Sequence, residues 1–301
     1  MSDAFDSASH DQLTRMLHGT WSGHTLLNLA LRLLFTVAGG YLILDDTVVE
    51  KPYARLLGEA AWVWSSKQRK VVFGVSVVLL VWTDGQVRIP LAFRLWHKGG
   101  PSKFTLALEL LSYARNRLHC KPQFVLFASW YPSQPLLKRL RDSGWYFVCQ
   151  LKKNRRFEGR PLVRYLQPPY WQATGSLVGG LKVFVVRYRR KYYATNRLSL
   201  SAKEVRTLYR KRQEVEEGIR VLKSQLSLEG CQAGYQRTAA TSPQPREGAQ
   251  EHHIALCLVA YLIVERERLD CGDTWRQRKR QLLLQGPQGV LPALERVRCA
   301  A

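Results

Sequence analysis

Acidic side chains are scarce in this sequence. The chain has 23 Asp and Glu against 46 Lys and Arg, which gives a formal net charge of +23 at pH 7 and an isoelectric point near 10.1. A field of this sign and size attracts polyanions. Nucleic acid is therefore the first candidate partner, and an anionic membrane surface is the second.

Long apolar runs and paired cysteines are missing as well. The longest apolar run, Val71 to Trp82, is too short to cross a bilayer as a helix. The 6 Cys include no C-x-x-C pair, which argues against a zinc ribbon and a disulfide framework. The first residues, MSDAFDSASHDQL, carry acids where a signal peptide carries basic residues. We expect a cytoplasmic protein with reduced thiols and no membrane span.

Apolar and aromatic residues, by contrast, are plentiful. The hydrophobic fraction of 46% and the 9 Trp argue against a disordered basic tail. A length of 301 residues allows one large domain with insertions, or two domains. The sequence therefore predicts a folded, basic protein.

The stretch from Tyr209 to Lys223 combines a polar and an apolar stripe. On one continuous helix, Tyr209, Arg212, Glu216 and Lys223 share a face. An apolar stripe runs beside it, consisting of Val205, Leu208, Val215, Ile219, Leu222 and Leu226. A carboxylate among cationic and hydroxyl groups suits a metal-binding Glu whose neighbours hold a phosphate chain. The alternative is a solvated helix face with i,i+3 and i,i+4 charge pairs.

Two acids follow a short apolar run that begins at Tyr41. Asp45 and Asp46 end the strand-like segment YLIL, where an acid is costly unless it is solvated, paired or bound to a cation. A carboxylate at a rigid strand end is well placed to hold a divalent ion. A turn-forming Asp pair is the alternative.

The segments around these acids predict alternating strands and helices. Apolar runs on both sides of Asp84-Gly85 indicate a hairpin. Residues 102–118 read as an amphipathic helix capped by Ser102, residues 124–127 as a strand, and residues 134–142 as a helix. Residues 11–36 read as two short helices, the second capped by Ser22.

The spacing Tyr, two residues, Arg, three, Glu, six, Lys resembles the Y-R-E-K signature of insertion-sequence transposases of the DDE superfamily. The resemblance implies an α/β fold: a ribonuclease H-like core, with a mixed sheet flanked by helices, a β-rich insertion, and helical N- and C-terminal segments. The predicted boundaries are 1–40 for the N-terminal helical segment, 41–151 and 201–267 for the two parts of the core, 152–200 for the insertion, and 268–301 for a basic C-terminal tail.

The same resemblance assigns roles to individual residues. It makes Glu216 the third catalytic carboxylate, and Asp46 the first, with Asp45 as the alternative. It implies that Tyr209, Arg212 and Lys223 contact DNA phosphates. In this family the carboxylates bind two Mg²⁺ or Mn²⁺ ions.

The second catalytic Asp is missing from its expected context. The family carries it after the fourth core strand, before Ser-Trp-Tyr, a basic helix and a Gly-Trp pair. This chain has Ser129-Trp130-Tyr131 and the later features in place, but Ala128 stands at the Asp position. Because a methyl group cannot bind a metal ion, we expect strand cleavage to be crippled and DNA binding, carried by Lys and Arg, to survive.

Further basic and aromatic residues are candidates for DNA contact. Lys153, Asn154 and Arg155 follow the predicted fifth strand and suit backbone contacts, with a solvated basic loop as the alternative. Trp171 is a candidate for stacking on an unpaired base by analogy, with local packing as the alternative.

The resemblance also implies an activity and partners. These are metal-dependent cleavage at transposon ends, strand transfer into target DNA, a homodimer that bridges two ends, and association with the bacterial nucleoid. Two other interpretations stay open: a non-catalytic, transposase-derived repressor or end-binding factor, and a nuclease or RNA-processing enzyme on the same fold.

Overall fold

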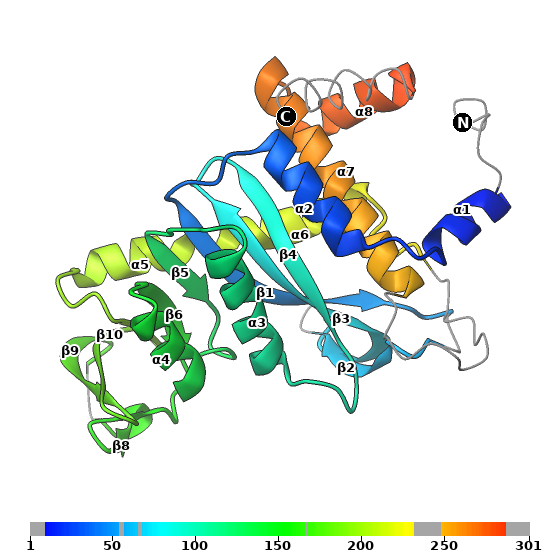
Figure 1. Cartoon of the computed structure of the whole chain (residues 1–301). Helices are drawn as coiled ribbons and strands as arrows, with labels where there is room; N and C mark the ends of the chain where they lie inside the picture. The colour runs from blue at the N-terminus through cyan, green and yellow to red at the C-terminus, as the bar shows by residue number, and fades with distance from the viewer. Residues whose placement is uncertain (1–9, 54–56, 66–67, 166–167, 232–247, 287–301) are drawn as a thin grey trace.

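A mixed sheet occupies the centre of the protein (Figure 1). The computed structural model describes residues 10–53, 57–65, 68–165, 168–231 and 248–286. Among these residues, the 11 strands follow the order β2-β3-β1-β5-β6-β11-β10-β9-β7-β8, with β4 paired to β3. The strands are β1 (Tyr41–Glu50), β2 (Ala61–Ser65), β3 (Lys70–Thr83), β4 (Arg88–Trp96), β5 (Phe124–Phe127), β6 (Phe147–Leu151), β7 (Arg156–Phe157), β8 (Arg160–Pro161), β9 (Tyr170–Leu177), β10 (Leu181–Tyr188) and β11 (Lys191–Thr195).

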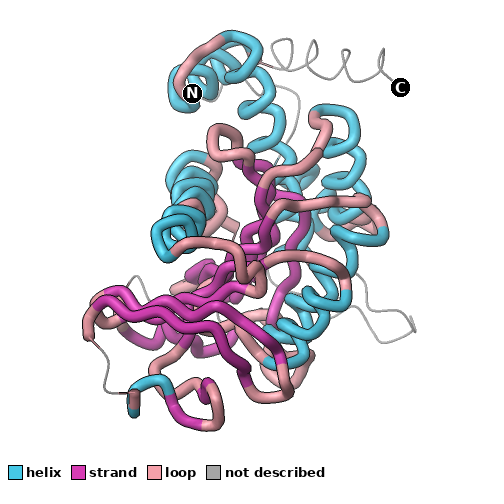
Figure 2. Tube along the Cα trace, turned by 90° about the vertical axis from the view of Figure 1, so that its left-hand side faces the viewer, coloured by secondary structure: helices cyan, strands magenta, loops and turns pink. Residues whose placement is uncertain are grey.

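Helices pack on both sides of this sheet, as Figure 2 shows. They are α1 (His10–Leu17), α2 (Gly23–Leu34), α3 (Lys103–Asn116), α4 (Gln134–Asp142), the 3-10 turn η2 (Leu162–Arg164), α5 (Ala202–Arg210), α6 (Gln213–Gln225), α7 (Ala249–Cys271) and α8 (Trp275–Gln285). The caps expected at Ser22 and Ser102 are confirmed, because each side chain accepts a hydrogen bond from the backbone three residues later. Within the described residues no helix is long and apolar enough to cross a membrane.

Strand β1 sits between partners of opposite direction. It pairs antiparallel with β3 and parallel with β5, where Leu44 and Phe127 form the last pair. The predicted hairpin between β3 and β4 is confirmed, and its turn is closed by Asp84, whose Oδ1 accepts from the backbone nitrogens of Gln86 and Val87 at 2.8 and 2.9 Å. Gly85 supplies the positive φ of 106° that this turn requires.

The strands expected in the insertion at 152–200 continue the core sheet. Strand β11 pairs antiparallel with β6, so that Tyr193 lies opposite Gln150, and β10 and β9 follow outward. Backbone hydrogen bonds therefore run without a break from the strand that carries the two acids to the basic, tyrosine-rich strands.

The helix expected to carry Tyr209, Arg212, Glu216 and Lys223 as one piece is divided. It ends as α5 at Arg210 and begins again as α6 at Gln213. The backbone nitrogens of Arg212, Glu214 and Val215 bond three residues back instead of four, which tightens the chain at this junction. The junction contains neither Gly nor Pro, so the sequence carried no breaker to reveal it.

A buried histidine of α7 contacts the N-terminal segment that contains α1 and α2. The two ring nitrogens of His252 lie 2.7 Å from the Leu17 carbonyl oxygen and 2.8 Å from that of Trp21. The Trp21 ring stacks on the imidazole with centroids 4.1 Å apart. His252 therefore joins the N-terminal segment to the core.

Candidate active site

The two acids of β1 point to opposite faces of the sheet, as strand alternation requires. Asp45 faces α6, where its Oδ2 lies 2.5 Å from Nη1 of Arg212. Asp46 faces the other side, where its Oδ2 lies 2.5 Å from Nζ of Lys103, the first residue of α3. Adjacent residues thus serve two separate ion pairs.

Arg212 joins Asp45 to Glu216. Its second terminal nitrogen, Nη2, pairs with Oε1 of Glu216, one turn along α6. Asp45 and Arg212 are 14% and 16% exposed, whereas Glu216 is 55% exposed. The structure therefore groups Glu216 with Asp45, the alternative of the two predicted acids, and not with Asp46. This cluster has one mostly buried carboxylate, that of Asp45, and one that is open to solvent, that of Glu216.

Burial makes the charge on Asp45 costly. Burial is the largest of the effects that together raise the pKa of this carboxyl from 3.8 to about 6. Asp46 and Glu216 also raise this pKa, while Arg212 lowers it. The guanidinium is thus the main group that keeps Asp45 ionised near neutral pH. A divalent cation bound here would supply the same compensation.

Asp46 is held from two sides. Besides its ion pair with Lys103, its Oδ1 accepts a hydrogen bond of 3.0 Å from the hydroxyl of Tyr131. Tyr131 is fully buried, and its burial, followed by the two nearby acids, raises the pKa of its hydroxyl well above the usual value. The hydroxyl therefore stays protonated as a donor. Sequence reasoning did not assign Lys103 or Tyr131 to the site, although Tyr131 belongs to the Ser-Trp-Tyr context.

The register of β1 and β5, continued one residue past its last pair, would place Ala128 beside Asp45. It follows Phe127 directly, and Phe127 pairs with Leu44, so the next residues along the two parallel strands are Ala128 and Asp45. Side chains at paired positions of parallel strands point to the same face. Among the described residues no group of three His, Cys, Asp or Glu side chains is arranged to hold a metal ion.

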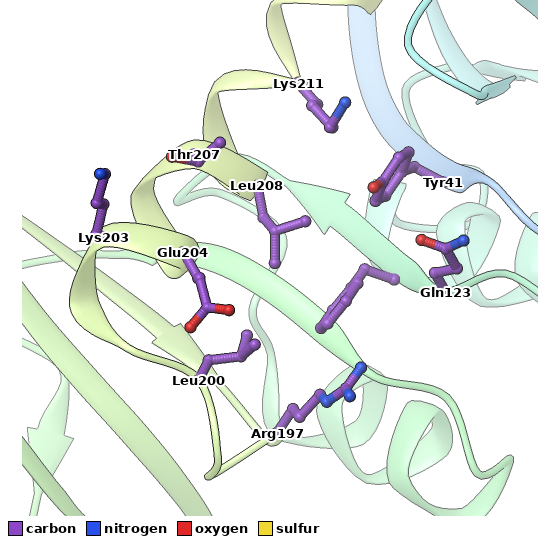
Figure 3. Close-up of a pocket in the computed structure, with 10 residues that line it drawn as sticks. Tyr41, Gln123, Arg197, Leu200, Lys203, Glu204, Thr207, Leu208 and Lys211 are labelled. Carbon is purple, nitrogen blue, oxygen red and sulfur yellow. The ribbon is translucent and has the colours of Figure 1, made fainter.

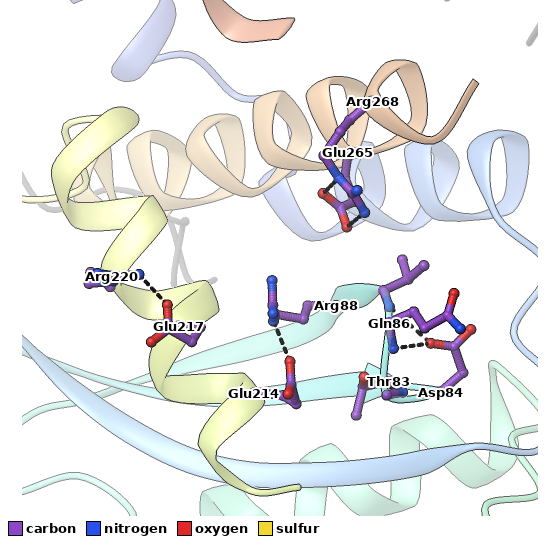
Figure 4. Close-up of polar contacts among 11 residues, drawn as sticks. Thr83, Asp84, Gln86, Arg88, Glu214, Glu217, Arg220, Glu265 and Arg268 are labelled. Carbon is purple, nitrogen blue, oxygen red and sulfur yellow. Dashed lines mark hydrogen bonds and ion pairs between the residues drawn. The ribbon is translucent and has the colours of Figure 1, made fainter. Parts of the chain in front are cut away.

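Contacts to the sheet fix the helix that carries Glu216. Figure 4 shows Arg88 of β4 reaching Glu214 on the first turn of α6, with Nε 2.7 Å from Oε2. Near the other end of α6, Lys223 donates to the backbone oxygen of Val48 and pairs with Glu229 at 2.8 Å. Lys223 is therefore held by β1 and Glu229, and its role as a phosphate contact stays a prediction.

Tyr209 lies between the sheet and Arg212. Its hydroxyl lies 3.2 Å from Oε1 of Gln150 on β6, to which it donates a hydrogen bond. Its ring packs on that of Tyr193, with centroids 4.8 Å apart. Burial raises the pKa of Tyr209 to about 12, against the lowering effect of Arg212. Of the four predicted signature residues, the structure therefore gathers Tyr209, Arg212 and Glu216.

A basic hollow of about 410 Å³ adjoins the Asp46 face. Asn154 and Arg155 line it, as do Trp130, which precedes Tyr131, and Phe104, which follows Lys103. Trp130 is 53% exposed, and the ammonium of Lys152 lies 4.3 Å from its ring centroid. Lys153 is exposed on the same loop. Sequence reasoning had named Trp171 as a stacking residue and had not considered Trp130 for that role.

Trp171 is packed within the protein. It is half-buried, and its ring meets Phe157 edge-on, with centroids 6.0 Å apart, and lies 5.9 Å from Tyr165. These contacts agree with the alternative of local packing. A stacking role for Trp171 stays a prediction.

A second hollow, of about 550 Å³, opens at the opposite edge of the sheet (Figure 3). Its wall includes Tyr41 and Phe124, the first residues of β1 and β5, together with Lys203 and Lys211 from the α5 side. Asp45 and Asp46 follow the last residue of β1 that pairs with β5, at the other end of these two strands. This hollow is therefore separate from the acid cluster.

The fold and the acids together define a class. The protein is an α/β protein with a mixed sheet, a central strand that carries two acids, and a helix that returns a third acid to one of them. The sequence model of the transposase DDE domain family matches residues 39–240, which is more than half of the chain. The chain therefore belongs to this transposase family.

A solved structure supports the fold. The chain is similar to a piggyBac transposase in a cryo-EM structure of its synaptic complex with hairpin DNA, with a TM-score of 0.55 and 14% sequence identity. The match covers 86% of this chain and 55% of that chain. The predicted fold class, a ribonuclease H-like core with a mixed sheet and flanking helices, is thus confirmed. No curated protein matches the sequence.

Proposed function

We propose that this chain is a DNA transposase of the DDE type whose strand cleavage and strand transfer are disabled by Ala128. The observation that carries this proposal is the position of Ala128, which follows the strand pair Leu44–Phe127 in step with Asp45. Asp45 and Glu216 share Arg212 on the same face of the sheet. We accordingly propose Asp45, and not Asp46, as the first catalytic carboxylate.

The donors on this face do not fit the two ions that the family implies. Two Mg²⁺ or Mn²⁺ ions would need a set of carboxylates, and among the described residues of this face Asp45 and Glu216 are the acids that converge, both on a guanidinium. Ala128 supplies no oxygen ligand from its side chain. The chain is therefore one carboxylate short of an intact site.

DNA is the partner that the charge supports. The net charge of +23 supplies the electrostatic attraction, which does not depend on the acids. Family membership supports transposon ends and target DNA as the sequences bound, and a homodimer that bridges two ends. On the same basis we propose that Tyr209 and Arg212 contact DNA, together with Lys153, Asn154 and Arg155 of the loop after β6.

One observation favours the alternative, a transposase-derived repressor or end-binding factor. Each acid of β1 already has a cation within 2.5 Å, Arg212 on one face and Lys103 on the other. A site neutralised in this way is stable without metal ions, as a protein that only binds DNA requires.

A nicking assay on DNA that bears the element's own ends tests the proposal. The parent chain, Ala128→Asp and Ala128→Asn are compared in Mg²⁺ and in Mn²⁺, because Asn matches Asp in shape but is a poor metal ligand. We expect cleavage by the Asp variant alone. If neither variant nor parent cuts while all three bind DNA equally, the catalytic proposal fails and the repressor alternative takes its place.

A further inference from the structure

The two flanks of α5 face opposite edges of the sheet. Lys203, Thr207 and Lys211 recur every four residues and line the hollow beside Tyr41 (Figure 3). On the other flank, Arg206 lies over the ring of Tyr188, at the end of β10. One short helix therefore presents lysines to one edge and arginine to the other.

Two groups of packed arginine and tyrosine side chains lie between the β10–β11 hairpin and the acid cluster. The guanidinium of Arg206 lies 3.3 Å from the ring centroid of Tyr188. Tyr193 on β11 packs on Tyr209 at 4.8 Å, and Arg212 lies 5.8 Å from the ring of Tyr209. These five residues, which we call the arginine–tyrosine row, end at the guanidinium that holds Asp45.

The tyrosine faces in this row are already used. Arg206 covers Tyr188, and the rings of Tyr193 and Tyr209 pack against each other at an angle of 57°. A base would have to displace these contacts before it could stack. What a ligand meets first is the guanidinium of Arg206, which the ring of Tyr188 holds in place, because such stacking leaves the N–H donors at the guanidinium edge free for an anion. The terminal nitrogens of Arg212 are already paired with Asp45 and Glu216.

The cations at the far end of the row have no acidic partner. Among the described residues, Arg206 makes no ion pair, and neither do its exposed neighbours Arg189, Arg190, Lys191 and Arg210. The segment from Lys182 to Arg197 contains no acidic residue at all. An external polyanion is the ligand that such a surface fits.

We propose that the arginine–tyrosine row holds the phosphate backbone of the DNA strand that enters the acid cluster. In this arrangement Arg206 contacts a phosphate, and Tyr188 is a positioning residue that stacks on Arg206 instead of on a base. The assignment rests on the proposed function for the identity of the strand. It goes further because it names the surface and assigns recognition to the DNA backbone. It also gives the bound strand a direction, from β10 to Arg212.

Paired variants on the two flanks of α5 test the surface. Arg206→Gln and Lys203→Gln each remove one cation from the same helix, and the full-length chain is titrated with a labelled duplex of arbitrary sequence over a range of salt concentrations. We expect Arg206→Gln to weaken binding about five- to tenfold at 0.1 M salt and to lower the salt slope by about 1. Lys203→Gln should leave both unchanged. Equal effects of the two variants would overturn the proposal.

Two variants of Tyr188 test the positioning role. Tyr188→Leu removes the platform but no charge, so we expect affinity to fall about two- to fivefold while the salt slope stays at the parent value. Tyr188→Phe keeps the ring and should bind like the parent. If Tyr188→Phe binds as weakly as Tyr188→Leu, the hydroxyl and not the ring matters, and the positioning role is lost. Thermal unfolding of each variant separates these effects from misfolding.

Failure of this inference and failure of the proposed function give different results. Should Ala128→Asp cut DNA, and should the double variant Ala128→Asp/Arg206→Gln bind and cut as well as Ala128→Asp, the row is wrong and the function stands. Should Ala128→Asp remain inactive while Arg206→Gln still weakens binding, the row stands and the catalytic proposal fails.

Discussion

Asp45 and Asp46 are neighbours in sequence, yet they inhabit different environments. Asp45 is buried against α6 and shares one arginine with Glu216. Asp46 lies on the other face, where Lys103 and the hydroxyl of Tyr131 hold it. Side chains alternate between the two faces of a strand, and this alternation decides which acid can act together with the helix. The identity of the residue does not decide it, because both are Asp. Variants on each face of the strand test this difference.

Removing Arg212 should have the largest effect on stability. Arg212→Gln leaves the buried carboxylate of Asp45 without its cation, and breaking such a pair costs about 3 kcal/mol. The cost should grow as the pH rises above 6, where Asp45 must be charged. Urea unfolding at pH 5 and pH 8 measures it. The double variant Asp45→Asn/Arg212→Gln is the control, and it should recover most of the loss.

The raised pKa of Asp45 predicts a pH dependence of opposite sign to that of an ordinary ion-paired carboxyl. Its pKa rises from 3.8 to about 6, so between these values the folded state binds more protons than the unfolded state. Its contribution to the free energy of unfolding is therefore lost as the pH rises through this window, by on the order of 3 kcal/mol. Asp45→Asn should flatten this limb. A limb that stays as steep in Asp45→Asn as in the parent would contradict the assignment.

Each polar contact on the Asp46 face should contribute less to the free energy of unfolding than the ion pair between Arg212 and Asp45. Tyr131→Phe removes one hydrogen bond to Asp46 and leaves Lys103 in place, which should cost about 1 kcal/mol in the free energy of unfolding. Chemical denaturation measures the change. A loss as large as that in Arg212→Gln would show that the two faces depend on their polar contacts equally.

The smallest effect on stability is expected at Glu216. With 55% of its side chain exposed, Glu216→Gln should change the free energy of unfolding by less than about 0.5 kcal/mol. In the Ala128→Asp background, however, it should abolish any cleavage gained. A double variant that still cuts DNA would remove Glu216 from the proposed site.

Local signals predicted much of the fold correctly. The hairpin at Asp84-Gly85 and the helix caps at Ser22 and Ser102 were all found from neighbouring residues, because turn and cap chemistry is local. The family was found from the spacing of Tyr209, Arg212, Glu216 and Lys223, and the family match agrees with it. Partners distant in sequence, such as Lys103 for Asp46, have no such local signal.

The charge, the family, the absence of an acid at position 128 and many of the strands and helices of the core could be read from the sequence alone. Only the tertiary structure decided that α5 and α6 are separate, that Asp45 meets Glu216, and that Lys223 points to β1. The physical reason is that propensity and capping act over a few residues, whereas ion pairs and ring contacts form between segments that only the packed sheet brings together.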